Sequence, residues 1–460
     1  MNDYYNKYLK YKKKYLGLKK EQNGGYINDE SFSIDGASSM YYFSNIKGKK
    51  ILLFGEHHIT SSTCSKQNKV LKNMIYQTDI IRFINYLENQ NEKNNSCLDF
   101  ILESEMVDKN ISAKNYSNII GFDRDLIKTE ENYFDKNQLT AFYFRGENNS
   151  NLSSSRLLEY YYVRSNCGVL KNIKNKNLFF KNNKNKFRFI KKCKKGFRVH
   201  LFDLFRIKSD KNIILHPFSI LYDLTLSQEK PVINDFLKKK YNLEFKDDKF
   251  NFNYINSIFI YLVGKKKDKN YEKGKKYFNE IYDYLVLSKI VLNYQKNLSM
   301  KIMTKKEVLN TSNKIQKQMK NIDKKYLKED DIYKYFELKL ENFVYKNKNF
   351  LNNIYILTPS QKIINFLRIA LTDIYSICRM FRNFKPKRKI VNCEGKKSMK
   401  NIIYYAGETH TNDILDFIKW KFKVEPDLNI NNNLNNKIDQ CLVVPTFKPF
   451  DFKMPWNNKN

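Results

Sequence analysis

Closely spaced cysteine pairs of the Cys-x-x-Cys type are absent from this chain. Its seven cysteines are odd in number and widely separated. Such a set excludes a zinc knuckle and does not indicate a disulfide framework. We therefore expect reduced thiols, as in a cytosol-like compartment.

Long hydrophobic runs are also absent. No uninterrupted apolar run approaches the roughly 20 residues of a membrane-spanning helix. The N-terminus is basic but lacks the apolar segment of a secretory signal. These absences predict a soluble, intracellular protein that is not secreted and has no transmembrane segment.

Acidic residues are few beside basic ones: 48 Asp and Glu stand against 84 Lys and Arg, a formal net charge of +36. One interpretation is a surface for nucleic acid or another polyanion. The other is compositional bias, because Lys, Asn, Ile, Tyr and Phe are used heavily while Ala, Gly and Pro are scarce, as an A+T-rich genome would dictate. The lysines are spread along the chain, which favours compositional bias.

Residues 1–25 form a separate unit. Tyrosines recur there at helical spacing with lysines on the other face, and the run ends at Gly24-Gly25. A short basic amphipathic helix of this kind can dock on a partner, lie on an anionic surface, be a removable leader cleaved after Gly25, or be a solvated helix without further role.

An α/β rhythm begins near residue 46. The apolar patterns predict strands at 49–54, 98–102, 197–202, 354–357, 401–406 and 441–444. They predict helices across 70–87, after the Thr304 capping box, after Thr358-Pro359, and after Thr411 as an N-cap. We expect an α/β fold with a mostly parallel sheet flanked by helices and interrupted by an α-helical insertion. The expected divisions are a leader (1–25), a linker (26–45), a first α/β part (46–229), the insertion (230–350), a second α/β part (351–450) and a tail (451–460).

Two of the predicted strands end in nearly the same tetrapeptide. These are Gly55-Glu-His-His58 and Gly407-Glu-Thr-His410, which together hold three of the five histidines of the chain. Two other predicted strands also end in polar residues. Because carboxyl ends of parallel strands share one edge of a sheet, we expect these groups to converge there. The candidate groups are Glu56, His57, His58, Glu103, Glu105, Asp203, Arg206, Glu408 and His410.

The chemistry of this set leaves three possibilities. Two imidazoles with carboxylates suit a divalent metal, held by His58 and His410, that polarises a carbonyl or activates water. They equally suit metal-free hydrolysis with a histidine as general base. A haem or other flat ligand held by histidine is the third.

Structural roles compete with these functional ones. A histidine after a strand is often a hydrogen-bonding residue of the core, Glu103 can cap a helix, and Asp203 and Arg206 can form an ion pair. His200 is expected to pack inside its strand, and His216, before Pro217, is expected in a loop.

The paired motifs and the strand-end Glu103 resemble the superfamily of TIKI/TraB-type proteases, ChaN-like haem-binding proteins and erythromycin esterases. The resemblance implies a pseudo-symmetric α/β fold of two halves with the site between them, and nominates His58, His410, Glu56 and Glu103. Residues 1–25 resemble the Tyr/Lys-rich Gly-Gly leader of proteins from mimivirus-like giant DNA viruses. That resemblance implies a host cytoplasm, viral-factory or virion location.

We therefore predict a hydrolase of ester or amide bonds that depends on a divalent metal or on histidine alone. His58 and His410 would bind the metal or act as base, Glu103 would activate water, and Arg206 would stabilise developing negative charge, with Glu56 and Glu408 completing the site. The alternatives are a non-catalytic, haem-like ligand-binding protein and a basic virion protein that binds nucleic acid.

Overall fold

The computed structural model describes the chain in segments. They are residues 31–57, 76–107, 158, 196–208, 213–226, 248–264, 268–287, 300–346, 359–383, 400–431 and 441–454. The expected leader (1–25), the expected strand at 354–357, His58 and Thr358 lie outside these residues.

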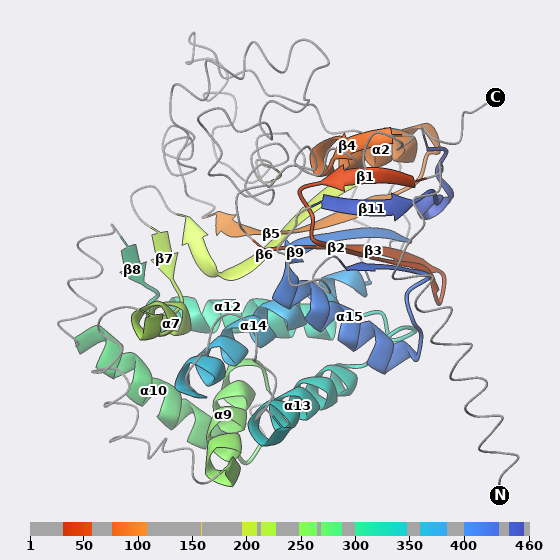
Figure 1. The fold of residues 1–460 in the computed structure, drawn as a ribbon. Helices are drawn as coiled ribbons and strands as arrows, with labels where there is room; N and C mark the ends of the chain where they lie inside the picture. Colours follow the sequence, from red (N-terminus) through yellow and green to blue (C-terminus); the bar gives the residue numbers. More distant parts are fainter. Residues whose placement is uncertain are drawn as a thin grey trace, which may run out of the picture.

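The larger of two β-sheets runs through the middle of the molecule (Figure 1). Its eight strands lie in the order β10-β2-β3-β9-β5-β6-β7-β8. The four central strands β3, β9, β5 and β6 are mutually parallel, which confirms the predicted α/β class with a mostly parallel sheet. The strands are β2 (Ser39–Ile46), β3 (Lys49–Glu56), β5 (Leu98–Val107), β6 (Phe197–Lys208), β7 (Ile213–Leu215), β8 (Met300–Ile302), β9 (Asn401–Gly407) and β10 (Leu428–Asn431).

The apolar runs of the two motif strands place them at the sheet centre. Residues 51–54 of β3 and 402–406 of β9 are buried on both faces. A strand covered on both faces carries apolar residues continuously instead of alternately, which is how both segments read in the sequence. The two strands are direct neighbours, with Gly55 opposite Ala406 and Glu56 opposite Gly407.

Different structures cover the two faces of the large sheet (Figure 1). One face carries a three-stranded sheet, ordered β11-β1-β4, together with helix α2. The other carries the remaining helices, among which α14 and α15 contact the central strands. The elements are β1 (Ser31–Asp35), β4 (Tyr76–Asp79), β11 (Cys441–Pro445), α2 (Ile80–Lys93), α7 (Pro217–Leu226), α9 (Asp248–Val263), α10 (Tyr271–Leu287), α12 (Lys305–Lys320), α13 (Glu329–Lys346), α14 (Pro359–Met380), α15 (Glu408–Phe422) and the 3-10 turn η5 (Pro449–Asp451).

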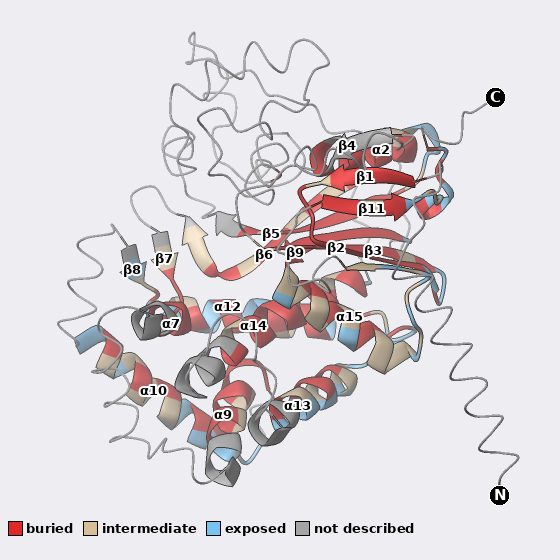
Figure 2. Cartoon of the chain, in the orientation of Figure 1, coloured by how far each residue is buried: buried red, intermediate tan, exposed pale blue. Residues whose placement is uncertain are grey.

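Each face of the sheet has its own hydrophobic core, and Figure 2 shows buried residues on both sides. Alternate residues along a strand point to opposite faces. In β5, for example, Ile101 packs in the helix-side core while Phe100 and Leu102 pack in the core under β1 and α2. A shift of one residue along a strand therefore changes the face of the sheet to which a side chain points.

Three local predictions are wrong. Residues 31–46, expected within or beside a linker, form β1 and β2. Residues 76–79, expected inside a helix, form strand β4, and the helix begins at Ile80. Thr411 is not an N-cap, because α15 begins at Glu408 with Gly407 as N-cap. The buried Thr411 hydroxyl instead lies 2.9 Å from the Phe54 carbonyl, to which it donates a hydrogen bond.

The predicted capping box is confirmed. The Glu307 amide donates to the Thr304 hydroxyl, and the Glu307 carboxylate accepts from the Thr304 amide. The segment expected as helical insertion contains α9, α10, α12 and α13, but it is not purely helical, because its strand β8 pairs with β7 in the large sheet.

Two further sequence expectations concern cysteines and membrane spans. Cys97 and Cys441 each take part in a disulfide bond, so the expectation of reduced thiols is wrong for these two residues. Cys378 is a buried free thiol. Within the described segments, no helix combines the length and the apolar character required to cross a membrane.

Candidate functional site

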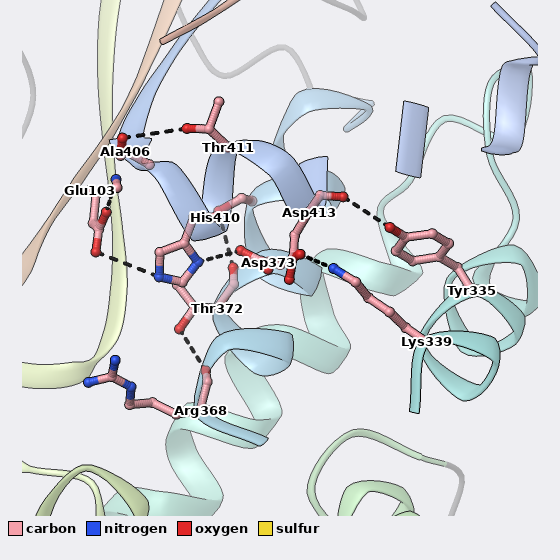
Figure 3. A network of polar contacts seen from close by, with 12 residues as sticks. Glu103, Tyr335, Lys339, Arg368, Thr372, Asp373, Ala406, His410, Thr411 and Asp413 are labelled. Atoms are coloured by element: carbon pink, nitrogen blue, oxygen red, sulfur yellow. Dashed lines mark hydrogen bonds and ion pairs between the residues drawn. The ribbon is translucent and has the colours of Figure 1, made fainter. Parts of the chain in front are cut away.

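A histidine whose side chain is 13% exposed lies where α15 leaves the central strand β9 (Figure 3). His410 belongs to the first turn of this helix. Its Nδ1 is 2.6 Å from Oδ1 of Asp373, a residue of α14 whose side chain is fully buried. A carboxylate at Nδ1 fixes the orientation and the tautomer of an imidazole, so Nε2 is the nitrogen left for chemistry.

Glu103 faces that second nitrogen. It follows directly after the residues of β5 that pair with β9, and its Oε1 is 3.6 Å from His410 Nε2. The backbone amide of Gly407, at the start of α15, donates a hydrogen bond of 2.6 Å to the other oxygen, Oε2. A helix N-terminus favours an ionised carboxylate. The imidazole thus lies between two carboxylates that come from different elements.

The charges of this trio are interdependent. Burial alone lowers the pKa of His410, but the Asp373 and Glu103 carboxylates outweigh it and hold the pKa above its ordinary value. Burial raises the pKa of Asp373, against the opposing effect of His410. The two carboxylates therefore stabilise the charged imidazolium relative to the neutral ring.

Aromatic rings and one arginine surround the imidazole. Phe202 of β6 meets the His410 ring edge-on, with centroids 5.9 Å apart, and stacks on Tyr404 at 5.2 Å. Arg368 lies one turn before Thr372 on α14, and its charge acts to lower the pKa of His410. Figure 3 shows its guanidinium on the same side of α14 as Glu103.

Glu408 belongs to a different contact set from His410. Its Oε2 accepts hydrogen bonds from Ser38, at 2.9 Å, and Ser39, at 2.7 Å. This carboxylate joins the beginning of β2 to the first turn of α15. Gly55 passes beside it, since a Cβ at that position would lie 2.2 Å from Glu408 Oε2. The close approach of Glu408 thus explains why the first motif has a glycine at this position.

Glu56 lies on the opposite face of the sheet from Glu103. It is fully buried, and its Oε2 is 2.8 Å from the hydroxyl of Tyr405, a residue of the core under β1 and α2. The same hydroxyl lies 2.6 Å from the Gly36 carbonyl. Glu56, predicted to be a catalytic carboxylate, therefore lies in the core. Successive residues of a strand point to opposite faces of the sheet, and Glu56 points to the face that is covered by β1 and α2.

Asp203, Arg206 and His57 are the remaining predicted residues whose positions the structure describes. Asp203 Oδ1 accepts a hydrogen bond of 2.9 Å from the amide of Phe205, at an irregularity of β6. Arg206 follows in the part of β6 that pairs with β7, opposite Leu215. His57 is half-buried at the end of a described segment. The side chain of Glu105 and all of His58 lie outside the described residues.

A second histidine–aspartate pair lies on the same face near the other end of the strands. His200 Nε2 is 2.8 Å from Asp99 Oδ1, and Arg198 binds Asp99 through two hydrogen bonds. Burial, reinforced by the charge of Arg379, lowers the pKa of His200 to about 4. Asp99 and Glu103 are four residues apart on β5, about 13 Å along a strand. The two histidine–aspartate pairs are therefore separate sites. His200, which was expected only to pack inside its strand, also forms a hydrogen bond with Asp99.

Sequence reasoning missed Asp373, Arg368 and the setting of His216. Asp373 lies three residues after Ala370 and four before Ile377, so a charged residue on the buried stripe of α14 was the available signal. His216, expected in a loop, is buried directly before α7 and lies against Phe205.

No family model matches the chain, and neither the curated proteins nor the solved structures include a significant match. The interpretation of the site therefore depends on its geometry. A carboxylate–imidazole–carboxylate arrangement at the carboxyl edge of a parallel sheet can transfer protons and can supply metal ligands.

Proposed function

We propose that the protein is a hydrolase of ester or amide bonds in which His410 transfers the proton of the attacking water. The observation that carries the proposal is the position of His410 between two carboxylates, Asp373 at Nδ1 and Glu103 at Nε2. Asp373 holds the ring so that Nε2 is available, as the orienting acid does in other histidine-dependent hydrolases.

The charges suit such a cycle. Above its raised pKa, His410 is neutral and takes a proton from water through Nε2. The imidazolium formed is then stabilised by both carboxylates, and it returns the proton to the leaving group. Arg368, whose charge reaches the site, replaces Arg206 as the residue proposed to stabilise the negative charge that develops on the substrate oxygen.

A divalent metal would find part of a ligand set here. His410 Nε2 and Glu103 Oε1 are the two donors, and the contact between Nδ1 and Asp373 is the usual support of a metal-binding histidine. Among the described residues no group of three or more His, Cys, Asp or Glu side chains fits a metal, so a further ligand would have to come from the rest of the chain, where His58 is the predicted one. A bound metal would supply Lewis-acid polarisation of the substrate carbonyl.

The test is a hydrolysis screen with the full chain on p-nitrophenyl esters and peptide anilides, with and without chelator. Wild type is compared with His410→Gln, Asp373→Asn and Glu103→Gln. Loss of a general base lowers kcat by about 10²- to 10⁴-fold.

The matched control is His200→Gln. It removes an equally buried imidazole, bonded to an aspartate on the same sheet face but near the other edge. We expect it to retain activity while losing a similar amount of stability. Equal activity of wild type and His410→Gln would refute the proposal, as would equal losses in His410→Gln and His200→Gln. Elemental analysis of wild type and His410→Gln tests the metal separately.

A further inference from the structure

Helix α12 exposes a face made of lysine and asparagine. Its other face packs in the helix-side core through Val308, Ile315 and Met319. The exposed residues recur at alternating steps of four and three positions, so they form one row along the helix. This α12 row consists of Lys306, Asn310, Asn313, Lys317 and Lys320, all of which are exposed. Its length is about 21 Å, because an α-helix rises roughly 1.5 Å per residue.

Basic charge is concentrated on α12 more than on neighbouring helices. This helix contains five lysines and one acidic residue, whereas α13 contains five acidic and three basic residues, and α10 contains three of each. A compositional bias toward lysine acts on every helix alike and would not produce such a difference. The turn that follows α12 adds three more exposed lysines, Lys324, Lys325 and Lys328.

The lysines of the α12 row carry charge that acidic side chains do not offset. Within the described residues, none of these three lysines forms an ion pair, whereas Lys305 beside them pairs with Asp283 at 2.7 Å. The one carboxylate of α12, Glu307, accepts hydrogen bonds from the amide and the hydroxyl of Thr304 in the capping box. Such a row collects counter-ions, and a polyanion that displaces them gains free energy.

The composition of the α12 row favours nucleic acid over a lipid surface. A helix that lies on a membrane needs large apolar residues beside its lysines to enter the interface. The positions between the lysines of this row are asparagines, and the one large apolar residue that α12 exposes is Leu309, at 39%. Asparagine and lysine side chains both donate hydrogen bonds to the phosphate oxygens of nucleic acids.

We propose that the α12 row binds the phosphate backbone of a nucleic acid. Lys306, Lys317 and Lys320 neutralise phosphates, and the two asparagines between them donate hydrogen bonds to phosphate oxygens. This role is independent of the proposed hydrolysis, because α12 contributes none of the residues that contact His410.

The test measures binding by fluorescence anisotropy over a range of salt concentrations, with a labelled DNA duplex of mixed sequence and a labelled RNA strand as probes. The full chain is compared with the triple variant Lys306→Gln/Lys317→Gln/Lys320→Gln, in which the exposed glutamines preserve helix propensity. Each lost phosphate contact reduces the slope of log K against log salt by about one, so the slope should fall by about three. The affinity should fall by about 100-fold at about 0.1 M salt.

The matched control is Lys93→Gln/Lys448→Gln/Lys453→Gln. It removes the same charge from three exposed lysines near α2 and η5, on the other side of the large sheet. These three lysines also form no ion pair among the residues that the structure describes. We expect the affinity and the salt slope of this variant to stay close to those of wild type.

A loss of binding confined to the α12 variant would support the proposal, and the probe that binds more tightly would identify the nucleic acid. Failure of wild type to bind either probe would overturn it. Equal losses in the two triple variants would also overturn it, because net charge alone would then determine binding. Sedimentation with phosphatidylserine vesicles tests the lipid alternative. Vesicle binding that depends on the three α12 lysines, in a protein that binds neither probe, would assign the row to a lipid surface.

Discussion

His216 makes the stability of the fold sensitive to mild acid. Its imidazole is only 1% exposed and lies between Phe205, at a centroid distance of 4.4 Å, and Phe218, at 5.3 Å. Burial lowers its pKa to about 3. In the unfolded chain the pKa is about 6.5. Stability is therefore complete above pH 6.5 and is lost as the pH falls from 6.5 toward the folded value, because only the unfolded state takes up the proton.

The magnitude follows from the interval between the two pKa values. At pH 5 the unfolded histidine lies about 1.5 pH units below its pKa, whereas the buried one is still neutral. At about 1.4 kcal/mol per pH unit, this difference removes about 2 kcal/mol from the free energy of unfolding. The result depends little on the exact folded pKa, provided that it lies well below 5.

The perturbation is His216→Phe, which keeps an aromatic ring between Phe205 and Phe218. It removes the acceptor of the 3.3 Å hydrogen bond from the Phe218 amide, a loss of about 1 kcal/mol at every pH. Urea unfolding at pH 7.5 and pH 5 separates the two effects. The decrease in the free energy of unfolding between these pH values should be about 2 kcal/mol smaller in the variant.

The contribution of His200 is common to both proteins and cancels in that comparison. Identical pH dependence in wild type and His216→Phe would refute the reasoning, since it would mean that the imidazole of His216 titrates normally in the folded protein. In that case His216→Phe would be destabilised equally at both pH values, and the only effect of the substitution would be the loss of the hydrogen bond from the Phe218 amide.

Three other predictions follow from the site and its supports. Gly55→Ala places a Cβ 2.2 Å from Glu408 Oε2 and should lower the free energy of unfolding, measured with urea, by about 2–4 kcal/mol. The loss should be smaller in a Glu408→Ala background, and an equal loss in both backgrounds would contradict the close-approach argument. Thr304→Ala removes the capping box and should lower the unfolding free energy by about 1 kcal/mol, whereas an unchanged value would mean that the cap contributes nothing. The rate of hydrolysis should increase as the pH rises through the raised pKa of His410. Asp373→Asn removes a neighbouring negative charge and should move the midpoint of the pH–rate profile downward. An upward shift would contradict the assignment of His410 as the general base.

The sequence predicts the central strands and helices well because their signals are local. Residues 51–54 and 402–406 are unbroken apolar runs, and Thr304 and Glu307 form a cap within a few residues. Strands β1 and β4 are short, and β1 pairs with β11 across most of the chain, so nothing local identifies them as strands. Such short segments become strands through tertiary contacts.

The candidate site was predicted in part. The convergence of Glu103 and His410 follows from parallel strands ending at one edge, and the structure brings them together. Glu56 could not be assigned correctly, because the face toward which it points depends on a one-residue parity that the motif does not reveal. Asp373 could not be paired with His410 because the contact depends on how α14 crosses the sheet.

The position of β9 has a consequence for how the chain acquires its structure. This strand lies between β3 and β5, although it follows both by hundreds of residues. Until residue 407 has been synthesised, β3 and β5 have no neighbour on their inner sides, and two hydrophobic edges stay open to pairing with other chains. Such long-range parallel pairing is slow, so aggregation during synthesis should compete with folding until the last central strand is inserted.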